Sequence, residues 1–193
     1  MRVELKRGTL NDLFTLKELV SMNYIDTCDK DITQAYITEY IDKTFTIPKL
    51  SKELTREDSL FYLMYVDKKL VGYTKLNKYE AQLDIKSPKS LEIEKIYILK
   101  DYQSKGLGKI LLNEIIRIAK NDNKEFIWSG VLEKNKNAIS FYNKNGFKQI
   151  GRFPFKVENY IKTSYVPAAE QRMAARTTHR FQIAIILIEG SHG

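Results

Sequence analysis

The sequence predicts an α/β (α+β) fold: a mixed, mainly antiparallel sheet of six to seven strands flanked by helices on both faces. Three observations lead to this fold class. Short segments of alternating apolar residues occur near both ends of the chain and form a hairpin in the middle. Helical segments follow the first strand, and a strand–turn–helix–strand order, typical of a parallel β-α-β unit, comes later.

The first part of the chain alternates a strand with helices. Val3 to Arg7 is the first predicted strand, and Thr9 is a suitable N-cap for a helix with apolar residues from Leu10 to Val20. A second helix is predicted from Asp31 to Phe45, and a short one from Pro48 to Leu54.

A hairpin and a third strand form the middle of the predicted sheet. Ser59–Val66 and Leu70–Tyr79 are strands joined by a turn at Asp67-Lys68-Lys69. A polar loop from Ala81 to Lys89 leads to the strand Ser90–Leu99.

The rest of the sheet comes from the C-terminal part. Lys124–Leu132 is a strand, and Asn135–Lys144 is a short helix that Asn145-Gly146 closes, since glycine suits the left-handed conformation. Phe147–Phe153 and about Tyr160–Val166 are the last two predicted strands.

Composition narrows the function classes. The 193 residues carry a formal net charge of +8, which suits nucleic-acid binding or an anionic cofactor; the lysines are spread along the chain, which disfavours nucleic acid. No apolar run is long enough for a transmembrane helix, and the N-terminal segment reads as a strand and not as a signal peptide. The single cysteine, Cys28, excludes an internal disulfide and indicates a cytoplasmic location.

The segment from Pro167 to Gly193 differs in composition from the residues before it. It contains none of the 24 lysines but five of the nine alanines and both histidines. We expect a functional domain at residues 1–166 and a tail at 167–193 of foreign origin, such as vector read-through; the alternative is a genuine extension with Arg180 to Ile188 as an added strand. Without the tail the chain has no histidine, so we expect neither a histidine triad nor a metal site.

A glycine-rich turn, Gln103 to Lys109, connects the strand Ser90–Leu99 to a predicted helix, Ile110–Lys120. Two glycines let a ligand approach the backbone closely, and the first amides of a helix point outward at the positive end of its dipole. The turn therefore predicts a phosphate or pyrophosphate site. Its spacing, Gly106-Leu107-Gly108-Lys109 before Ile110, matches neither a Walker A loop nor a dinucleotide-binding fingerprint.

Three segments occur in a distinctive order. They are Leu91-Glu92-Ile93-Glu94-Lys95-Ile96-Tyr97-Ile98, then Gln103-Ser104-Lys105-Gly106-Leu107-Gly108-Lys109, then Asn135-Lys136-Asn137-Ala138-Ile139-Ser140-Phe141-Tyr142 with Asn145-Gly146-Phe147. This order resembles the GNAT superfamily of acetyl-CoA-dependent N-acetyltransferases, whose pattern is Q/R-x-x-G-x-G/A, N-x-x-A-x-x-x-Y and G-F. The resemblance covers residues 1 to about 166. Within the superfamily, the chain is most similar to PaiA-type spermidine/spermine acetyltransferases.

The resemblance implies a coenzyme A site. Main-chain groups of a strand would pair with the pantetheine arm, the turn amides would hold the pyrophosphate, and two asparagines would face the pantetheine. The implied residues are Ile96, Tyr97, Ile98, Gln103, Ser104, Lys105, Gly106, Leu107, Gly108, Lys109, Asn135, Asn137, Tyr142 and Lys144, the last at the adenosine end.

The resemblance also implies catalytic roles. Tyr142, near the coenzyme sulfur, would be the general acid that protonates the leaving thiolate. Glu92 stands where some superfamily members keep a catalytic glutamate, and Glu94 shares its sheet face by period two. Either could relay a proton from a cationic amine, or both could be solvent-facing charges. Glu92 is the first choice for the base.

The expected function is acetyl transfer from acetyl-CoA to a primary amine, with spermidine or spermine favoured, by direct attack in a ternary complex. One alternative is a protein or peptide acceptor, and another is a regulatory module that binds coenzyme A or nucleic acid without turnover. A homodimer is also implied, because strand edges near the C-terminus often pair between subunits in this superfamily.

Overall fold

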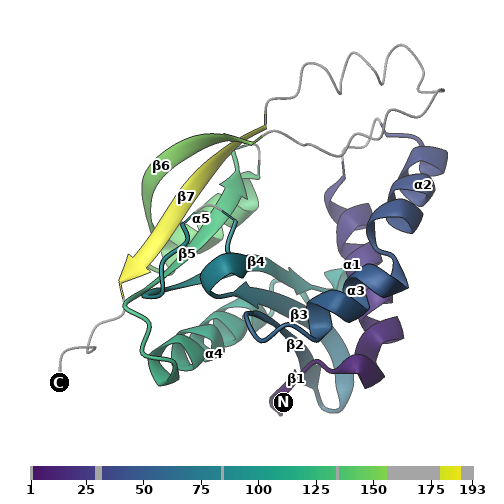
Figure 1. The fold of residues 1–193 in the computed structure, drawn as a ribbon, viewed down its shortest axis with the longest axis horizontal. Coiled ribbons are helices and arrows are strands. Elements are labelled where there is room, and N and C mark those ends of the chain that lie inside the picture. The colour runs from purple at the N-terminus through teal and green to yellow at the C-terminus, as the bar shows by residue number, and fades with distance from the viewer. Residues whose placement is uncertain (1, 29–31, 84, 134, 156–178, 188–193) are drawn as a thin grey trace. The chain divides into compact units, whose positions relative to one another are not determined.

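The computed structural model describes residues 2–28, 32–83, 85–133, 135–155 and 179–187, which are coloured in Figure 1. They divide into two compact units, Met1–Trp128 with Leu187–Gly193, and Ser129–Ile186. Each unit is described by itself. Within the described residues, no helix combines the length and the apolar character needed to cross a membrane.

The first unit contains most of the sheet and four helices. Its elements in chain order are β1 (Val3–Arg7), α1 (Leu13–Thr27), α2 (Gln34–Thr44), α3 (Ile47–Leu54), β2 (Ser59–Val66), β3 (Lys69–Asn77), β4 (Ser90–Ile98), α4 (Leu107–Asn121) and the start of β5 (Phe126–Leu132). Short 3-10 turns lie at Leu10–Asp12, Tyr79–Ala81 and Lys100–Tyr102.

The observed elements follow the predicted ones, with shifts at their ends. Thr9 caps its turn as expected, since its side chain accepts a bond from Asn11 N–H, but α1 proper begins only at Leu13. Helix α4 begins at Leu107, three residues before the predicted start, because Gly106 takes the N-cap position. Strand β3 ends at Asn77, since Tyr79 has a positive φ of 49° and begins a turn.

The sheet of this unit is antiparallel except at one junction. Strands β1, β2, β3 and β4 pair in sequence order, and β4 pairs in parallel with β5. The β2–β3 turn places Asp67 and Lys68 at φ 47° and 68°, the left-handed values that a two-residue hairpin turn requires. The mixed, mainly antiparallel sheet that the sequence predicts is confirmed.

Helices cover both faces of the sheet. Helices α1 and α3 pack on Phe61, Leu63 and Tyr73, which alternate along β2 and β3 toward one face. Leu60 and Met64 of β2 are buried on the other face, and the amphipathic helix α4 contacts β4. Figure 1 shows α4 and the α1–α3 group on opposite sides of β2–β4.

The second unit contains the end of β5, α5 (Lys136–Lys144), β6 (Lys148–Phe155) and β7 (His179–Leu187). Its strand order is β5-β7-β6, and β6 and β7 are antiparallel. Strand β7 lies in the segment that we expected to be of foreign origin. Its position matches the added strand, Arg180 to Ile188, of the alternative in which this segment is a genuine extension. The predicted strand Tyr160–Val166 lies outside the described residues.

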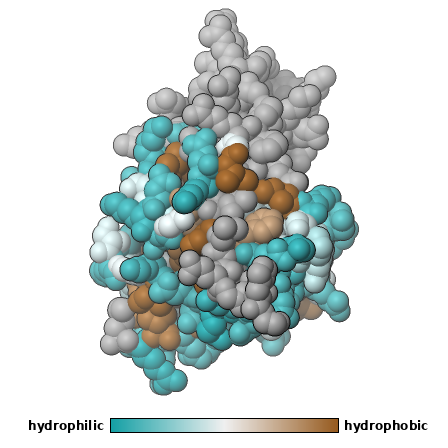
Figure 2. All heavy atoms as spheres, turned by 90° about the vertical axis from the view of Figure 1, so that its left-hand side faces the viewer, coloured by the Kyte–Doolittle hydropathy of each residue, from teal (hydrophilic) through white to brown (hydrophobic). Residues whose placement is uncertain are grey.

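Polar side chains dominate the surface. Figure 2 shows hydrophilic residues over most of the described surface in that view, with hydrophobic residues in separate patches. Scattered patches of this kind are normal for a globular surface.

Candidate active site

Strand β4 pairs with β5 over only a short stretch. The parallel ladder joins Ser90–Glu92 to Phe126–Trp128. Among the described residues, Glu94–Ile98 has no strand partner on that edge. The bond from Leu99 N–H to the Val71 carbonyl (2.8 Å) sets the phase of the β3–β4 ladder. In this phase the main-chain groups of Tyr97 face β3, whereas those of Ile96 and Ile98 face the other edge.

The glycine turn follows this edge after the 3-10 turn at Lys100–Tyr102. Gly106 adopts the left-handed conformation (φ 77°) at the N-cap of α4, without a side-chain cap. Within the described residues, the N–H groups of Leu107 and Gly108 have no protein acceptor, as expected at a helix start. A Cβ built on Gly106 would meet nothing within 4 Å, so the space over the turn is open. The Gln103 amide donates to the Ile98 carbonyl at 2.8 Å and joins the turn to β4.

Two lysines of the turn, Lys105 and Lys109, are exposed and positively charged. Lys105 donates to the Asp101 carbonyl at 2.7 Å, and its ammonium lies 5.3 Å from the centre of the Tyr102 ring, within the range of a cation–π contact. Ser104 is also exposed. Outward-facing amides, two ammonium groups and the positive end of α4 together suit a phosphate or pyrophosphate.

Glu92 and Glu94 lie on one face of the sheet, as the sequence predicts, and both contact Asn77 of β3. The Asn77 amide nitrogen donates to Glu92 Oε2 at 3.1 Å and to Glu94 Oε2 at 2.8 Å. The Asn77 oxygen accepts from the Ser59 hydroxyl at 3.2 Å, which fixes the direction of the amide. Sequence reasoning missed Asn77, because only the register of β3 against β4 brings it opposite Glu92.

Glu94 lies at a bulge in β4. Lys95 lies opposite Lys75 and Ile93 opposite Leu76, so Glu94 is the extra residue between them. The Lys75 ammonium contacts Glu94 at 2.7 Å and Glu53 of α3 at 3.0 Å. We call Glu53, Lys75, Asn77, Glu92 and Glu94 the acidic cluster. Lys75 and Glu53 carry no sequence signal for this role.

Opposite charges outweigh burial in the acidic cluster. Burial by itself would raise the pKa of the Glu94 carboxyl, but Lys75, then Lys95 and the hydrogen bonds from Lys75 and Asn77, bring that pKa below its ordinary value. Burial likewise opposes the charge on Lys75, yet Glu94 and Glu53 raise the pKa of its ammonium. Glu94 and Lys75 are therefore both charged at neutral pH.

Glu92 fastens the loop between β3 and β4. Its Oε2 accepts from Leu83 N–H at 3.0 Å, and the residue is 2% exposed. The same loop is held by Gln82, whose side-chain oxygen accepts from Trp128 Nε1 at 2.8 Å and from the Ser90 hydroxyl at 2.6 Å. Buried side chains therefore hold the first half of this loop in place.

Helix α1 is joined to the end of β4 by a second polar contact. The Tyr97 hydroxyl donates to Asp26 Oδ2 at 2.7 Å, and the Lys100 ammonium contacts Asp26 Oδ1 at 2.6 Å. Burial and the bond to Asp26 raise the pKa of Tyr97 above its ordinary value. The Tyr97 side chain therefore has a structural partner on α1, apart from any role of its main chain.

Tyr142 lies on α5 in the second unit. Its ring contacts Phe141 and Phe147, with centroid distances of 5.3 and 4.8 Å, and the residue is buried. Burial raises the pKa of its phenol to about 12, although a hydrogen bond with Ser129 acts in the opposite direction. At neutral pH the hydroxyl is protonated and can donate a proton.

The other implied coenzyme residues of the second unit lie along the same helix. Asn135 caps α5, and its side-chain oxygen accepts from Ala138 N–H at 3.0 Å. Asn137 and Lys144 are exposed. The structure thus brings together the turn, the β4 edge and the acidic cluster in one unit, and Asn135, Asn137, Tyr142 and Lys144 in the other.

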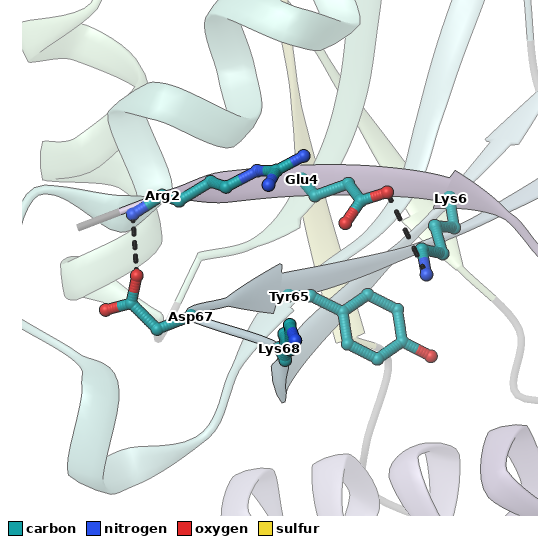
Figure 3. Close-up of a pocket in the computed structure, with 6 residues that line it drawn as sticks. All are labelled: Arg2, Glu4, Lys6, Tyr65, Asp67 and Lys68. Carbon is teal, nitrogen blue, oxygen red and sulfur yellow. Dashed lines mark hydrogen bonds and ion pairs between the residues drawn. The ribbon is translucent and has the colours of Figure 1, made fainter.

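A depression of about 560 Å³ lies at the β1 edge of the sheet. Figure 3 shows Arg2 N–H directed at Asp67 and Lys6 beside Glu4. Its walls carry both signs of charge, and none of the implied site residues lines it. Among the residues that the structure describes, no group of three His, Cys, Asp or Glu side chains could hold a metal ion.

Comparison with known families gives a match over most of the chain. The profile of the acetyltransferase (GNAT) family matches residues 25–147. An uncharacterized N-acetyltransferase from Lactobacillus delbrueckii subsp. lactis is 33% identical over 143 residues, which are 74% of this chain and 83% of that protein. A spermidine N(1)-acetyltransferase from Thermoplasma acidophilum is 30% identical over 159 residues, covering 77% of this chain and 89% of that protein.

Solved structures share the fold. The PaiA N-acetyltransferase from Thermoplasma acidophilum, in complex with coenzyme A, superposes with a TM-score of 0.67 at 23% identity and covers 95% of this chain and 98% of its own. The ribosomal-protein-S18-alanine N-acetyltransferase from Escherichia coli gives a TM-score of 0.61 at 15% identity, with 98% and 96% covered.

Proposed function

The chain belongs to the acetyltransferase (GNAT) family and is an acetyl-CoA-dependent N-acetyltransferase, and we propose that its acceptor is a polyamine such as spermidine or spermine. The observation that carries this proposal is the acidic cluster, which gathers two carboxylates of β4 and one of α3 around Lys75 and Asn77 of β3. The formal net charge of the chain is +8, but in this cluster carboxylates outnumber ammonium groups, which favours a cationic acceptor. The 30% identical spermidine N(1)-acetyltransferase supports the same acceptor class.

The glycine turn fits the pyrophosphate of coenzyme A. Gly106 leaves open space over the start of α4, and the adjoining Leu107 and Gly108 amides have no protein acceptor within the described residues. We assign the pyrophosphate to the amides of Gln103–Lys109 and the pantetheine arm to the free β4 edge, chiefly the main chain of Ile96. Bound acetyl-CoA supplies the thioester acetyl group.

The acceptor must lose a proton before its nitrogen can attack the thioester carbonyl. We assign this proton to the acidic cluster, where Glu94 is the better-placed carboxylate: its side chain is 18% exposed, whereas Glu92 is 2% exposed and its Oε2 accepts two hydrogen bonds. A water molecule between amine and carboxylate could carry the proton.

The new C–N bond forms as the C–S bond breaks, and the electron pair of that bond leaves on sulfur. We assign protonation of this thiolate to Tyr142, whose phenol is protonated at neutral pH. No covalent enzyme intermediate is needed in this scheme.

The proposal is tested by measuring thiol release from acetyl-CoA with spermidine, spermine, monoamines and peptides. We expect kcat/KM for the polyamines to exceed that for peptides by at least about tenfold, which corresponds to roughly 1.4 kcal/mol of selective binding. Equal or better turnover of peptides would contradict the polyamine proposal, and no release with any amine would favour a module without turnover.

The role of Tyr142 has its own test. Tyr142→Phe removes the hydroxyl and keeps the ring contacts, so kcat should fall about 100-fold while the Kd for coenzyme A stays unchanged. Phe141→Leu, a change on the same helix that leaves the hydroxyl in place, is the control. Undiminished kcat in Tyr142→Phe would exclude the hydroxyl as the general acid.

A further inference from the structure

We infer that Lys75 is a positioning residue for acetyl transfer, because its ammonium, held by Glu53, fixes the Glu94 carboxylate at the bulge of β4. The inference deepens the proposed function and rests on it, since it concerns the carboxylate assigned to the acceptor proton. Lys75 does not receive that proton; it acts through Glu94.

The contacts of Lys75 are those of a buried bridge between two elements. Its ammonium lies 2.7 Å from Glu94 on β4 and 3.0 Å from Glu53 on α3, and its side chain is only 13% exposed. The ammonium also lies 5.5 Å from the centre of the Phe61 ring. Mutation of an exposed lysine usually costs little stability. Mutation of Lys75 removes the ammonium that two partly buried carboxylates share.

Among the residues that the structure describes, the charged and titratable groups that face Glu94 single out Lys75. From β3 come Lys75, Asn77 and Tyr73; from α3 comes Glu53; and from β4 itself come Glu92 and Lys95. Lys95 is exposed and therefore screened by water, whereas Glu53 and Glu92 carry like charges. Without Lys75, burial and like charges together would favour the protonated form of Glu94, which cannot accept a proton.

Asn77 completes the arrangement and separates the two glutamates. One amide nitrogen donates to both carboxylates, and the amide oxygen is held by the Ser59 hydroxyl. Glu92 accepts a hydrogen bond from Leu83 N–H of the loop, whereas Glu94 forms an ion pair with Lys75. The two glutamates therefore differ in role. Glu92 holds the loop, and Glu94 is a charged group at a partly exposed position.

The test compares Lys75→Gln with Lys75→Arg, and uses Lys69→Gln as the matched control. Lys69 is an exposed residue of the same strand. The pH dependence of kcat/KM for spermidine and the titration of the Glu94 carboxyl by carbon-13 NMR are both measured. In Lys75→Gln we expect the Glu94 pKa and the acidic limb of the profile to move up by about one unit or more. In Lys75→Arg and Lys69→Gln they should stay within a few tenths of the wild-type values.

A second variant, Glu53→Gln, tests the inference if Lys75→Gln does not fold. Glu53→Gln keeps an acceptor for the ammonium but removes a like charge, so the Glu94 pKa should stay unchanged or fall. A rise in Glu53→Gln, or an unshifted Glu94 pKa in a folded Lys75→Gln, would overturn the inference. A uniform loss of rate with an unmoved profile would also overturn it, since that result indicates a structural role alone.

The NMR titration separates this inference from the proposed function. If no amine is acetylated by the wild-type protein, the acceptor proposal fails, yet the Glu94 pKa in Lys75→Gln still reports on the bridge. If spermidine is acetylated and the Glu94 pKa does not respond to Lys75, the function stands and the inference fails.

Discussion

The glycine turn and the acidic cluster are built in opposite ways, although both belong to the first unit. The turn presents main-chain N–H groups beside exposed side chains, and its central feature is a residue with no side chain, Gly106. The acidic cluster presents side chains that contact one another across α3, β3 and β4. We therefore expect the turn to tolerate side-chain changes that keep its backbone, whereas each member of the cluster depends on its partners.

The largest expected effect comes from the cluster. Glu94→Gln keeps the size of the side chain but removes the proton acceptor, so kcat for spermidine should fall about 100-fold or more. The Kd for coenzyme A, measured by calorimetry, should not change, because the turn is not altered. Glu92→Gln is the comparison, with a smaller loss of kcat. A larger loss in Glu92→Gln than in Glu94→Gln would reverse the assignment of the two carboxylates.

A change in the turn should affect coenzyme binding instead of the chemical step. Gly106→Val places a Cβ on a residue with φ 77°, a strain of roughly 1–2 kcal/mol, so coenzyme A should bind about tenfold more weakly. Gly106→Asn is the control, since asparagine tolerates the left-handed conformation and should retain most of the affinity. Equal losses in both variants would show that space over the turn matters more than backbone conformation.

The smallest effect is expected from removal of an exposed charge of the turn. Lys109→Gln should raise the KM for acetyl-CoA about two- to threefold at low ionic strength, because exposed charges contribute little and are screened by salt. The increase should shrink at 0.5 M NaCl in a steady-state assay. An effect that salt does not weaken would indicate a direct, desolvated contact with the coenzyme.

Local patterns account for the parts of the fold that the sequence predicts. The hairpin at Asp67 and Lys68, the strand limits Ser59–Val66 and the N-cap at Thr9 depend on residues within a few positions of one another. The same holds for the turn at Gly106, where a strand, a left-handed residue and a helix start follow directly in sequence. Element ends moved by a few residues, because caps and turns compete with the periodic pattern.

Long-range packing decides the rest. The contacts of Lys75 with Glu53 and of Asn77 with Glu92 and Glu94 join residues 22, 15 and 17 positions apart, and a bulge in β4 sets their register. Nothing near Lys75 or Asn77 in the sequence marks them, because their partners lie on another strand or helix. Strand β7 is a similar case, because its pairing with β6 is a tertiary contact.

The fold class, the glycine turn and the presence of two glutamates on one face of a strand can be predicted from the sequence, because each follows from local periodicity and backbone conformation. The difference between the two glutamates depends on contacts between distant parts of the chain. Glu92 is committed to the loop and Glu94 to a buried ammonium, and burial strengthens both interactions by removing the water that would otherwise screen them.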